Sequence, residues 1–390
     1  MNNLSVLATF KGYGLSDTIS ALRSREITYN ILTLLSELGV DYTVANYLYF
    51  KKEVKNIKSI KLSKNRIVFL YKMLTNVKKL LEDKKISLIH HIRLSYYEFD
   101  VLSLFGLIKD YPFVVGPAQA PHMIFEDDYA LGKRSNRKSI KAEYHAVRVL
   151  RKIVSPIINY AFERTLEDCD TLIVVNEKTK KIYSNIVSNK KIEVIPLGVF
   201  IDEFQFSPPP LNHEILTTGA HLKRKGFEYL ITAMPSILKE YPDARLHILS
   251  DGPRREHLEG LTRDLGLKSN VIFHGYLSVN ELLSFYKNCR IFCHPSLSEG
   301  FCHTTLEAMA SGRPVVSTDT NGSEMVEHNK TGFVVPTGDS EAISDAILRI
   351  LNNDDLTYKM GINARTKVEK EYDWHKIARK YYEIYCKLCG

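Results

Sequence analysis

Short apolar runs rich in β-branched residues alternate with stretches of helical periodicity along the whole chain. In the first half, six such runs predict strands at residues 4–10, 41–48, 86–92, 112–118, 171–176 and 192–199. Between the first two runs, residues 26–38 repeat apolar side chains at helical spacing, namely Ile27, Ile31, Leu34, Leu35 and Leu38. Apolar strands separated by helices are typical of a parallel sheet that is covered on both faces. The first half therefore predicts an α/β domain.

The stretch 200–213 interrupts this alternation, and its prolines at 208–210 fit neither a helix nor a central strand, so it predicts a linker. The alternation then resumes, with strands expected at 214–220, 244–252, 271–277, 290–296, 314–319 and 332–336. We predict the α/β class with two facing Rossmann-like, doubly wound domains at 1–199 and 214–371. A C-terminal helix at 372–390 is expected to pack back on the first domain. Because ligands bind outside the carboxyl ends of such strands, a cleft between the two domains is the expected site.

The segment SEGFCHTTLEAMASGRPVVSTD, at 298–319, carries the densest chemical signal. A strand that ends near Pro295 leads into a turn with Glu299, and a helix is expected to begin around His303. A helix N-terminus presents N–H groups and partial positive charge, which suits a pyrophosphate. Glu299 before that end and Glu307 eight residues later can accept hydrogen bonds from the hydroxyl groups of a ligand on either side of its phosphates.

These residues resemble a known family. The E-x7-E spacing of Glu299 and Glu307, inside SEGFxxxxLEAMAxGxPVV, is similar to the signature of family 4 retaining glycosyltransferases (glycosyltransferase group 1), which have the two-Rossmann GT-B fold. Segments 219–231, 249–267, 271–289 and 321–336 follow in the family's order, and 191–204 resembles its interdomain junction. The resemblance covers 165–390, whereas the first 165 residues match only loosely.

The resemblance implies roles for individual residues. Glu299 and Lys225 would be catalytic: Glu299 would bind the donor sugar near the reacting centre, and Lys225 would place positive charge on the leaving phosphates. Glu307 would bind the ribose hydroxyls. Backbone amides around Phe301–Thr305 would hold the diphosphate, and the base would lie near Gly275–Leu277. The complete donor site expected in this chain is Gly219, His221, Arg224, Lys225, Gly275, Leu277, Glu299, Gly300, Phe301, Cys302, Thr304, Thr305 and Glu307.

The chain also departs from the family pattern. Ala220 and His221 stand where the family usually has an arginine, so Arg224 could supply that contact to the diphosphate. Cys302 replaces a common glycine, although its main-chain N–H is retained. The expected acceptor-side residues of the first domain are Gly14, His91, Gln119 and His122.

The resemblance implies transfer of a sugar from a nucleotide-diphosphate donor, with UDP favoured, and retention of an α-linkage without an obligatory metal. The expected acceptor is a glycan or lipid-linked molecule in cell-surface polysaccharide or glycolipid synthesis. Two alternatives stay open: a non-catalytic partner subunit of the same fold, and a nucleotide-sugar epimerase. The acidic run at 126–128 resembles a metal-binding motif but lies in a polar loop pattern, and no cofactor is expected.

Charge adds a possible partner. Residues 1–200 hold 31 Lys and Arg against 20 Asp and Glu, a net charge of +11, whereas the rest of the chain is net −3. The basic residues concentrate at 133–152, next to apolar positions that continue to 157. Basic amphipathic helices bind anionic membranes, so peripheral membrane binding is one interpretation and a solvated domain helix is the other. No nucleic-acid-binding module is recognisable, and we expect no nucleic-acid partner.

Two further expectations concern the compartment. No apolar run reaches the roughly 20 residues that span a bilayer, and the start lacks the pattern of a signal peptide. We therefore expect a cytoplasmic location, on the inner face of the cell membrane if the membrane contact forms. The six cysteines are expected to be free thiols, including the C-x-x-C pair Cys386 and Cys389.

Overall fold

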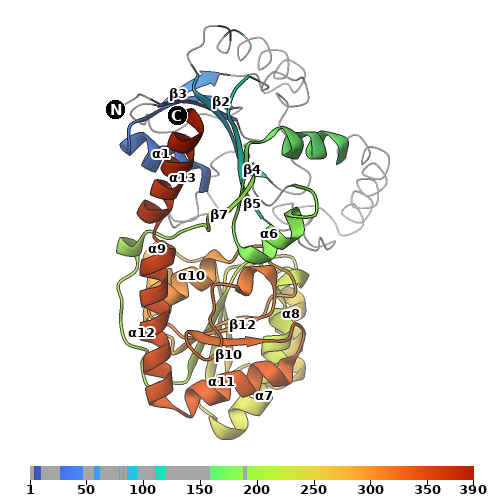
Figure 1. Cartoon of the computed structure of the whole chain (residues 1–390). Coiled ribbons are helices and arrows are strands. Elements are labelled where there is room, and N and C mark those ends of the chain that lie inside the picture. The colour runs from blue at the N-terminus through green and yellow to red at the C-terminus, as the bar shows by residue number, and fades with distance from the viewer. Residues whose placement is uncertain are drawn as a thin grey trace. The chain divides into compact units, whose positions relative to one another are not determined.

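The computed structural model describes residues 4–9, 27–46, 57–61, 79, 82, 86–94, 110–119, 159–187 and 191–390. The described residues divide into two compact units, and Figure 1 labels the elements of both. The first unit comprises the described residues up to 187 together with 191–198 and Trp374–Gly390. The second comprises Val199–Asp373.

The first unit contains, in its described part, a parallel seven-stranded sheet with the order β3-β2-β1-β4-β5-β6-β7. Its strands are β1 (Leu4–Thr9), β2 (Val40–Asn46), β3 (Ile57–Lys61), β4 (Leu88–Leu94), β5 (Phe113–Ala118), β6 (Thr171–Val174) and β7 (Ile192–Val194). Helices α1 (Ile27–Glu37) and α6 (Glu177–Tyr183) accompany them, and residues 159–168 are also helical. All six strands expected in this half are present. The pattern missed β3, an edge strand whose sequence IKSIK carries two lysines, as edge strands often do.

The C-terminal helix α13 (Trp374–Cys389) is part of the first unit and packs against α1, β1 and β4. Its side chains Trp374, Tyr381 and Tyr385 are fully buried. The hydroxyl of Tyr42 donates to that of Tyr385, and the Tyr385 hydroxyl in turn contacts Nδ1 of His90. Hydrogen bonds therefore fasten the end of the chain to strands near its beginning.

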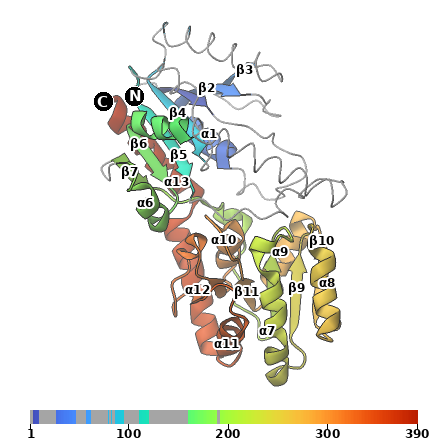
Figure 2. The same cartoon turned by 90° about the vertical axis from the view of Figure 1, so that its right-hand side faces the viewer.

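The second unit contains a parallel six-stranded sheet with the order β10-β9-β8-β11-β12-β13 within the described residues. Its strands are β8 (Glu214–Thr218), β9 (Arg245–Leu249), β10 (Val271–Gly275), β11 (Ile291–His294), β12 (Val315–Thr318) and β13 (Gly332–Val335). Its helices are α7 (Phe227–Glu240), α8 (Arg255–Asp264), α9 (Val279–Asn288), α10 (His303–Ala310), α11 (Ser340–Leu351) and α12 (Asp354–Glu371), drawn in Figure 2. This order is that of a Rossmann sheet, with its reversal between β8 and β11.

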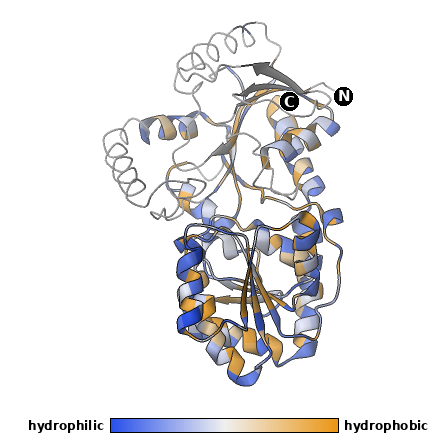
Figure 3. Ribbon diagram, turned by 180° about the vertical axis from the view of Figure 1, so that it is seen from behind, coloured by the Kyte–Doolittle hydropathy of each residue, from blue (hydrophilic) through white to orange (hydrophobic). Residues whose placement is uncertain are grey.

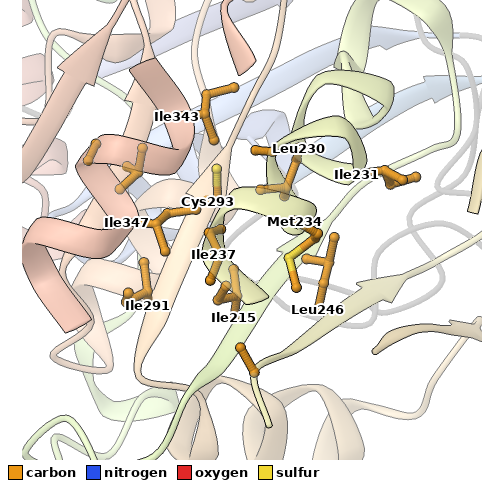
Figure 4. Close-up of a cluster of buried hydrophobic side chains, with 14 of the residues drawn as sticks. Ile215, Leu230, Ile231, Met234, Ile237, Leu246, Ile291, Cys293, Ile343 and Ile347 are labelled. Atoms are coloured by element: carbon orange, nitrogen blue, oxygen red, sulfur yellow. The ribbon is translucent and has the colours of Figure 1, made fainter. Parts of the chain in front are cut away.

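The core of the second unit lies between the sheet and the helices α7, α8 and α11 (Figure 4). Strand residues such as Ile215, Leu246 and Ile291 meet Met234 and Ile347 from the helices. Figure 3 shows apolar residues along these strands and hydrophilic residues on the outer sides of the helices. Burial of these aliphatic side chains stabilises the sheet by about 1.5–3 kcal/mol each, which gives the loops at its carboxyl edge a rigid base.

The stretch expected to be a linker, 200–213, is packed along the second unit. The guanidinium of Arg313 is buried and donates to the carbonyl and hydroxyl oxygens of Ser207, as well as to the Cys289 carbonyl at 2.8 Å. Arg365 donates to the Phe204 and Ala310 carbonyls, each at 2.6 Å. The two arginines thus hold the part of this stretch that directly precedes its three prolines.

Candidate donor site

The sequence-predicted donor residues gather where the second sheet reverses its strand order. The segment after β8 carries Gly219, Arg224 and Lys225, and the segment after the adjacent β11 carries Glu299. Both segments follow carboxyl ends of neighbouring parallel strands, and a crevice for ligands forms where the crossovers diverge to opposite faces. The order of the strands therefore brings together residues that the sequence separates by about 75 positions.

Two glycines shape the cationic turn η4 (Lys223–Lys225). Gly226 is left-handed, with φ of 62°, and a Cβ there would lie 2.1 Å from the Pro295 carbonyl oxygen. Gly219, with φ of 150°, lies against the aliphatic part of the Lys225 side chain. Gly226 has no room for a side chain because η4 approaches the β11 loop closely, whereas Gly219 is favoured by its positive φ. The backbone there is joined by a 2.8 Å hydrogen bond from the Leu297 N–H to the Arg224 carbonyl.

The Glu299 carboxylate is the centre of a charge cluster. One of its oxygens, Oε2, accepts hydrogen bonds from Lys225 and, at 3.2 Å, from Arg224, and it lies 3.9 Å from Nε2 of His294. Burial by itself would raise the pKa of Glu299, but the charges of Lys225, Arg224 and His294 outweigh burial and lower it to about 2. Glu299 is therefore ionised throughout the neutral pH range and binds the two cations of η4, Lys225 and Arg224.

Helix α10 begins immediately after this carboxylate, with Cys302 at its N-cap. The Cys302 side chain contacts His294 Nδ1 at 3.4 Å and the hydroxyls of Thr304 and Thr305, both at 3.1 Å, rather than capping the helix amides. Burial would raise the pKa of this thiol, but His294, with Lys225 adding to it, lowers the pKa to about 7. The first backbone N–H groups of a helix have no acceptor within the helix, so this end can receive an anion.

The second glutamate of the motif is enclosed. Glu307 lies in α10 and is fully buried, and its Oε2 accepts a 2.7 Å hydrogen bond from the hydroxyl of Tyr286 in α9. Tyr286 is itself fully buried between Phe204 and Phe292. A carboxylate fixed in this way is held rigidly for further hydrogen bonds, and the sequence pattern alone did not indicate its tyrosine partner.

The remaining donor-side predictions fall in two groups. Gly275, with φ of 70°, and Leu277 lie at the carboxyl end of β10, at the same edge of the sheet. The ring of His221, in contrast, is fully buried edge-on against Phe227 and Phe273, and burial lowers its pKa. Its surroundings are those of a packed core residue, so a donor contact from position 221 would have to come from the main chain.

The acceptor-side predictions are only partly covered by the structure. His91 lies buried on β4, and the main-chain carbonyl of Gln119 accepts a hydrogen bond from the Tyr183 hydroxyl at 3.4 Å. Gly14 and His122 lie outside the described residues, as do the acidic run 126–128 and the basic segment 133–152.

All six cysteines are free thiols, with Cys386 and Cys389 exposed on α13. In the part of the chain that the structure describes, no helix is long and apolar enough to cross a membrane. Likewise, no cluster of three His, Cys, Asp or Glu side chains suited to a metal ion occurs among the described residues.

Besides Tyr286, sequence reasoning missed two further contributors to the site. His294 lies at the end of β11 between Cys302 and Glu299. Gly322 lies in the turn after β12, where its N–H donates to the Glu299 carbonyl at 2.8 Å and a Cβ would lie 3.1 Å from Cγ of Glu299. The position of His294 at the end of a predicted strand, directly before Pro295, could have indicated a site residue from the sequence. The contact of Gly322 with Glu299 depends on tertiary structure and could not.

The second unit is similar to a known protein family. Residues 201–367 match the family described as "Glycosyl transferases group 1". The second unit belongs to this family. The match includes every predicted donor residue of the site, so the group 1 resemblance read from the E-x7-E motif is confirmed.

Relatives of the group 1 domain were found among curated proteins. An uncharacterized glycosyltransferase of Methanocaldococcus jannaschii is 34% identical over 172 residues, which are 44% of this chain and 44% of that protein. A GDP-mannose-dependent α-(1-6)-phosphatidylinositol monomannoside mannosyltransferase of Mycobacterium tuberculosis is 28% identical over 245 residues, 58% of this chain and 64% of that protein. The chain thus spans about half to two thirds of the length of these relatives.

Solved structures resemble the whole chain. A glycosyltransferase from Rickettsia africae has a TM-score of 0.71 at 19% identity and covers 100% of this chain and 99% of its own. HepE of Anabaena in complex with UDP also has a TM-score of 0.71, at 15% identity, covering 99% of this chain and 100% of its own. These similarities confirm the GT-B fold class, with two Rossmann-like units.

Proposed function

We propose that this protein is a retaining glycosyltransferase that moves a sugar from a nucleotide-diphosphate donor to a glycan or lipid-linked acceptor. The observation that carries the proposal is the Glu299 cluster. An ionised carboxylate, two cations and a helix N-terminus converge at the reversal point of a sheet that belongs to the group 1 family. Each of these groups can stabilise charge that develops when a sugar leaves a diphosphate.

In this reaction the bond between the sugar's anomeric carbon and the diphosphate breaks, and the acceptor hydroxyl forms a new bond to that carbon and loses its proton. Negative charge grows on the departing diphosphate while positive charge grows on the sugar. Lys225, Arg224 and the amides that begin α10 would stabilise the first, and Glu299 the second. Glu307, held by Tyr286, would bind the ribose hydroxyls. Since these cations can neutralise the leaving group, we propose that the reaction needs no obligatory metal.

We propose a lipid-linked acceptor, reached through the first unit. In support, the M. tuberculosis relative is named for transfer to a phosphatidylinositol monomannoside, and a Mycobacterium leprae relative, 28% identical over 221 residues, is a phosphatidyl-myo-inositol mannosyltransferase. The net charge of +11 in residues 1–200 would favour anionic membranes.

Binding of the donor is tested by thermal shift with UDP, GDP, ADP and their sugars. A nucleotide at 100 times its Kd should stabilise the protein by about 2.7 kcal/mol. UDP is our expectation, whereas the M. tuberculosis relative is GDP-dependent, so these two nucleotides are the decisive pair. Stabilisation by none of them would contradict a donor site in this unit.

The reaction is tested by incubating the protein with a labelled donor that it binds. In the presence of EDTA we expect either release of free sugar or transfer to an acceptor. NMR of the product should show that the anomeric configuration of the donor is retained. An epimerase would convert the sugar while it stays on the nucleotide, and a non-catalytic partner subunit would release nothing. Complete loss of activity with EDTA, restored by Mn²⁺, would contradict the metal-independent proposal and direct attention to Asp127 and Asp128.

Membrane binding is tested separately by sedimentation with anionic and neutral vesicles at low and high salt. We expect salt-sensitive binding to anionic vesicles only. Reversing the charge of Arg134, Arg137, Lys138 and Lys141 should release the protein while nucleotide binding is unchanged. A wild-type protein that stays in the supernatant at low salt would favour a soluble glycan acceptor.

A further inference from the structure

His294 lies between the two polar groups that begin the α10 segment. Its side chain is 2% exposed, with Nδ1 3.4 Å from the Cys302 sulfur and Nε2 3.9 Å from Oε2 of Glu299. The backbone is fixed because His294 ends a strand paired with β12 and its carbonyl accepts from Thr318 Oγ1 at 3.2 Å. Within the described residues Nε2 has no hydrogen-bond partner, which is costly for a buried polar nitrogen.

The contact of the Cys302 sulfur with Nδ1 can select which nitrogen of the ring carries a proton. When the thiol is neutral, its S–H can donate to Nδ1, and the imidazole proton then lies on Nε2. When the thiol has lost its proton and the ring is charged, both nitrogens carry protons. In either state Nε2–H faces the Glu299 carboxylate. The hydroxyls of Thr304 and Thr305 hold the sulfur in place for this contact.

The carboxylate needs such a donor once a substrate arrives. At present its Oε2 is bound by Lys225 and Arg224, the two cations that a diphosphate would also attract. If they turn toward phosphate, Glu299 loses both partners while its side chain remains only 13% exposed. A buried carboxylate without partners is costly, and it would be free to rotate away from the sugar. Nε2 of His294 needs to approach by only about 1 Å to reach hydrogen-bond distance.

We propose that His294, oriented by Cys302, is a positioning residue that holds the Glu299 carboxylate in place when the donor diphosphate engages Lys225 and Arg224. The proposal rests on the function proposed above, in which Glu299 acts on the donor sugar. In this proposal His294 and Cys302 act together through Glu299, and neither of them contacts the substrate.

Two conservative substitutions separate the two sides of the ring. The side-chain amide of glutamine reaches about as far as Nε2, and that of asparagine about as far as Nδ1. His294→Gln should therefore keep the contact to Glu299, whereas His294→Asn should keep only the contact to Cys302. His213→Asn is the matched control, because His213 precedes β8 at the opposite end of the strands and pairs with Asp243.

For donor hydrolysis or transfer, His294→Asn should lower kcat about 10-fold to 100-fold with the donor KM nearly unchanged, because a misplaced reacting group costs on this order. The kcat of His294→Gln should stay within about threefold of the wild-type kcat. Equal losses in both variants, a loss in KM alone, or wild-type kcat in His294→Asn would overturn the proposal. Wild-type protein without any donor-dependent reaction would instead contradict the proposed function.

A second measurement does not depend on activity. In protein with ¹⁵N-labelled histidine, the His294 resonance, assigned by its loss in His294→Asn, should report a proton on Nε2. The Cys302→Ala variant should shift this resonance toward a mixture of tautomers, whereas Cys302→Ser should preserve it. A wild-type ring protonated only on Nδ1 would overturn the proposal even if the protein showed no activity.

Discussion

Each of the two units buries a histidine on the strand next to its first, at the point where the strand order reverses. His90 lies on β4 beside β1, and His294 lies on β11 beside β8. Both histidines are buried, with at most 1% of the residue exposed. Their surroundings differ in kind. His90 bonds the Gly116 carbonyl through Nε2 at 2.9 Å and the Tyr385 hydroxyl through Nδ1, whereas His294 faces a low-pKa thiol and an ionised carboxylate.

The difference separates a structural from a chemical role. Burial lowers the pKa of His90 to about 3, although the Gly116 carbonyl opposes that shift, and both ring nitrogens are satisfied by neutral groups. The His90 ring thus links α13 to the sheet, and its hydrogen-bonding groups are already satisfied. Around His294, by contrast, each contact is with a group that can ionise or bind substrate. The same strand position and the same residue type therefore say little about function until the partners are known.

The largest effect should come from Glu299, the centre of the His294 cluster. Glu299→Gln should lower kcat on the order of 10²-fold or more, because the fixed negative charge beside the sugar is lost. Nucleotide affinity should not fall, since Lys225 and Arg224 lose their competing partner. Kinetics and calorimetric titration with the preferred nucleotide measure both. Glu307→Ala is the comparison and should mainly weaken nucleotide binding, so equal effects on affinity would contradict this assignment.

Lys225 tests whether the cluster's cations act on the donor. Lys225→Ala should cost about 10-fold or more in kcat and also weaken donor binding, because a leaving diphosphate gains charge in the transition state. Lys239→Ala, at an exposed lysine in the last turn of α7, is the control. Unchanged donor titration in Lys225→Ala would leave Lys225 with only a structural role at the start of α7.

The His90 network should affect stability instead of turnover. Tyr385→Phe removes the hydroxyl that joins Tyr42 and His90, and it should destabilise the first unit by about 1–3 kcal/mol because buried polar groups lose their partner. Denaturant unfolding measures the change. Tyr358→Phe, at a half-exposed position of α12, should have almost no effect. A lower kcat per folded molecule in Tyr385→Phe would contradict a purely structural role of His90 and so its difference from His294.

The smallest effect concerns the charge of Cys302. Below its pKa of about 7 the thiol is neutral, and above that pH it adds a negative charge at the start of α10. Affinity for a nucleotide sugar should therefore fall about threefold to tenfold as the pH rises from 6 to 8, by repulsion of the diphosphate. A nucleotide sugar is the probe because its diphosphate does not titrate in this range. Cys302→Ser should show a flat profile, and a parallel decline in that variant would exclude the thiol as the cause.

The sequence by itself determined the elements and the chemistry available to them. Apolar runs located all twelve strands that the pattern predicted, because a buried parallel strand requires them. The E-x7-E spacing placed Glu299 before α10 and Glu307 within it, because helix boundaries follow local signals. The exception was β3, whose two lysines in five residues resemble an exposed segment more than a buried strand.

Only the tertiary structure decided which of these groups meet. Lys225 reaches Glu299 across 74 positions, and Tyr42 reaches Tyr385 across 343, because sheet order and helix packing join distant segments. The same packing buried Glu307 against Tyr286, and it buried His221, for which the family resemblance implied a donor contact. It also aimed His294 at Cys302 and Glu299. Local sequence fixes where a side chain leaves the backbone, but its partners and its charge state depend on the neighbouring strands and loops.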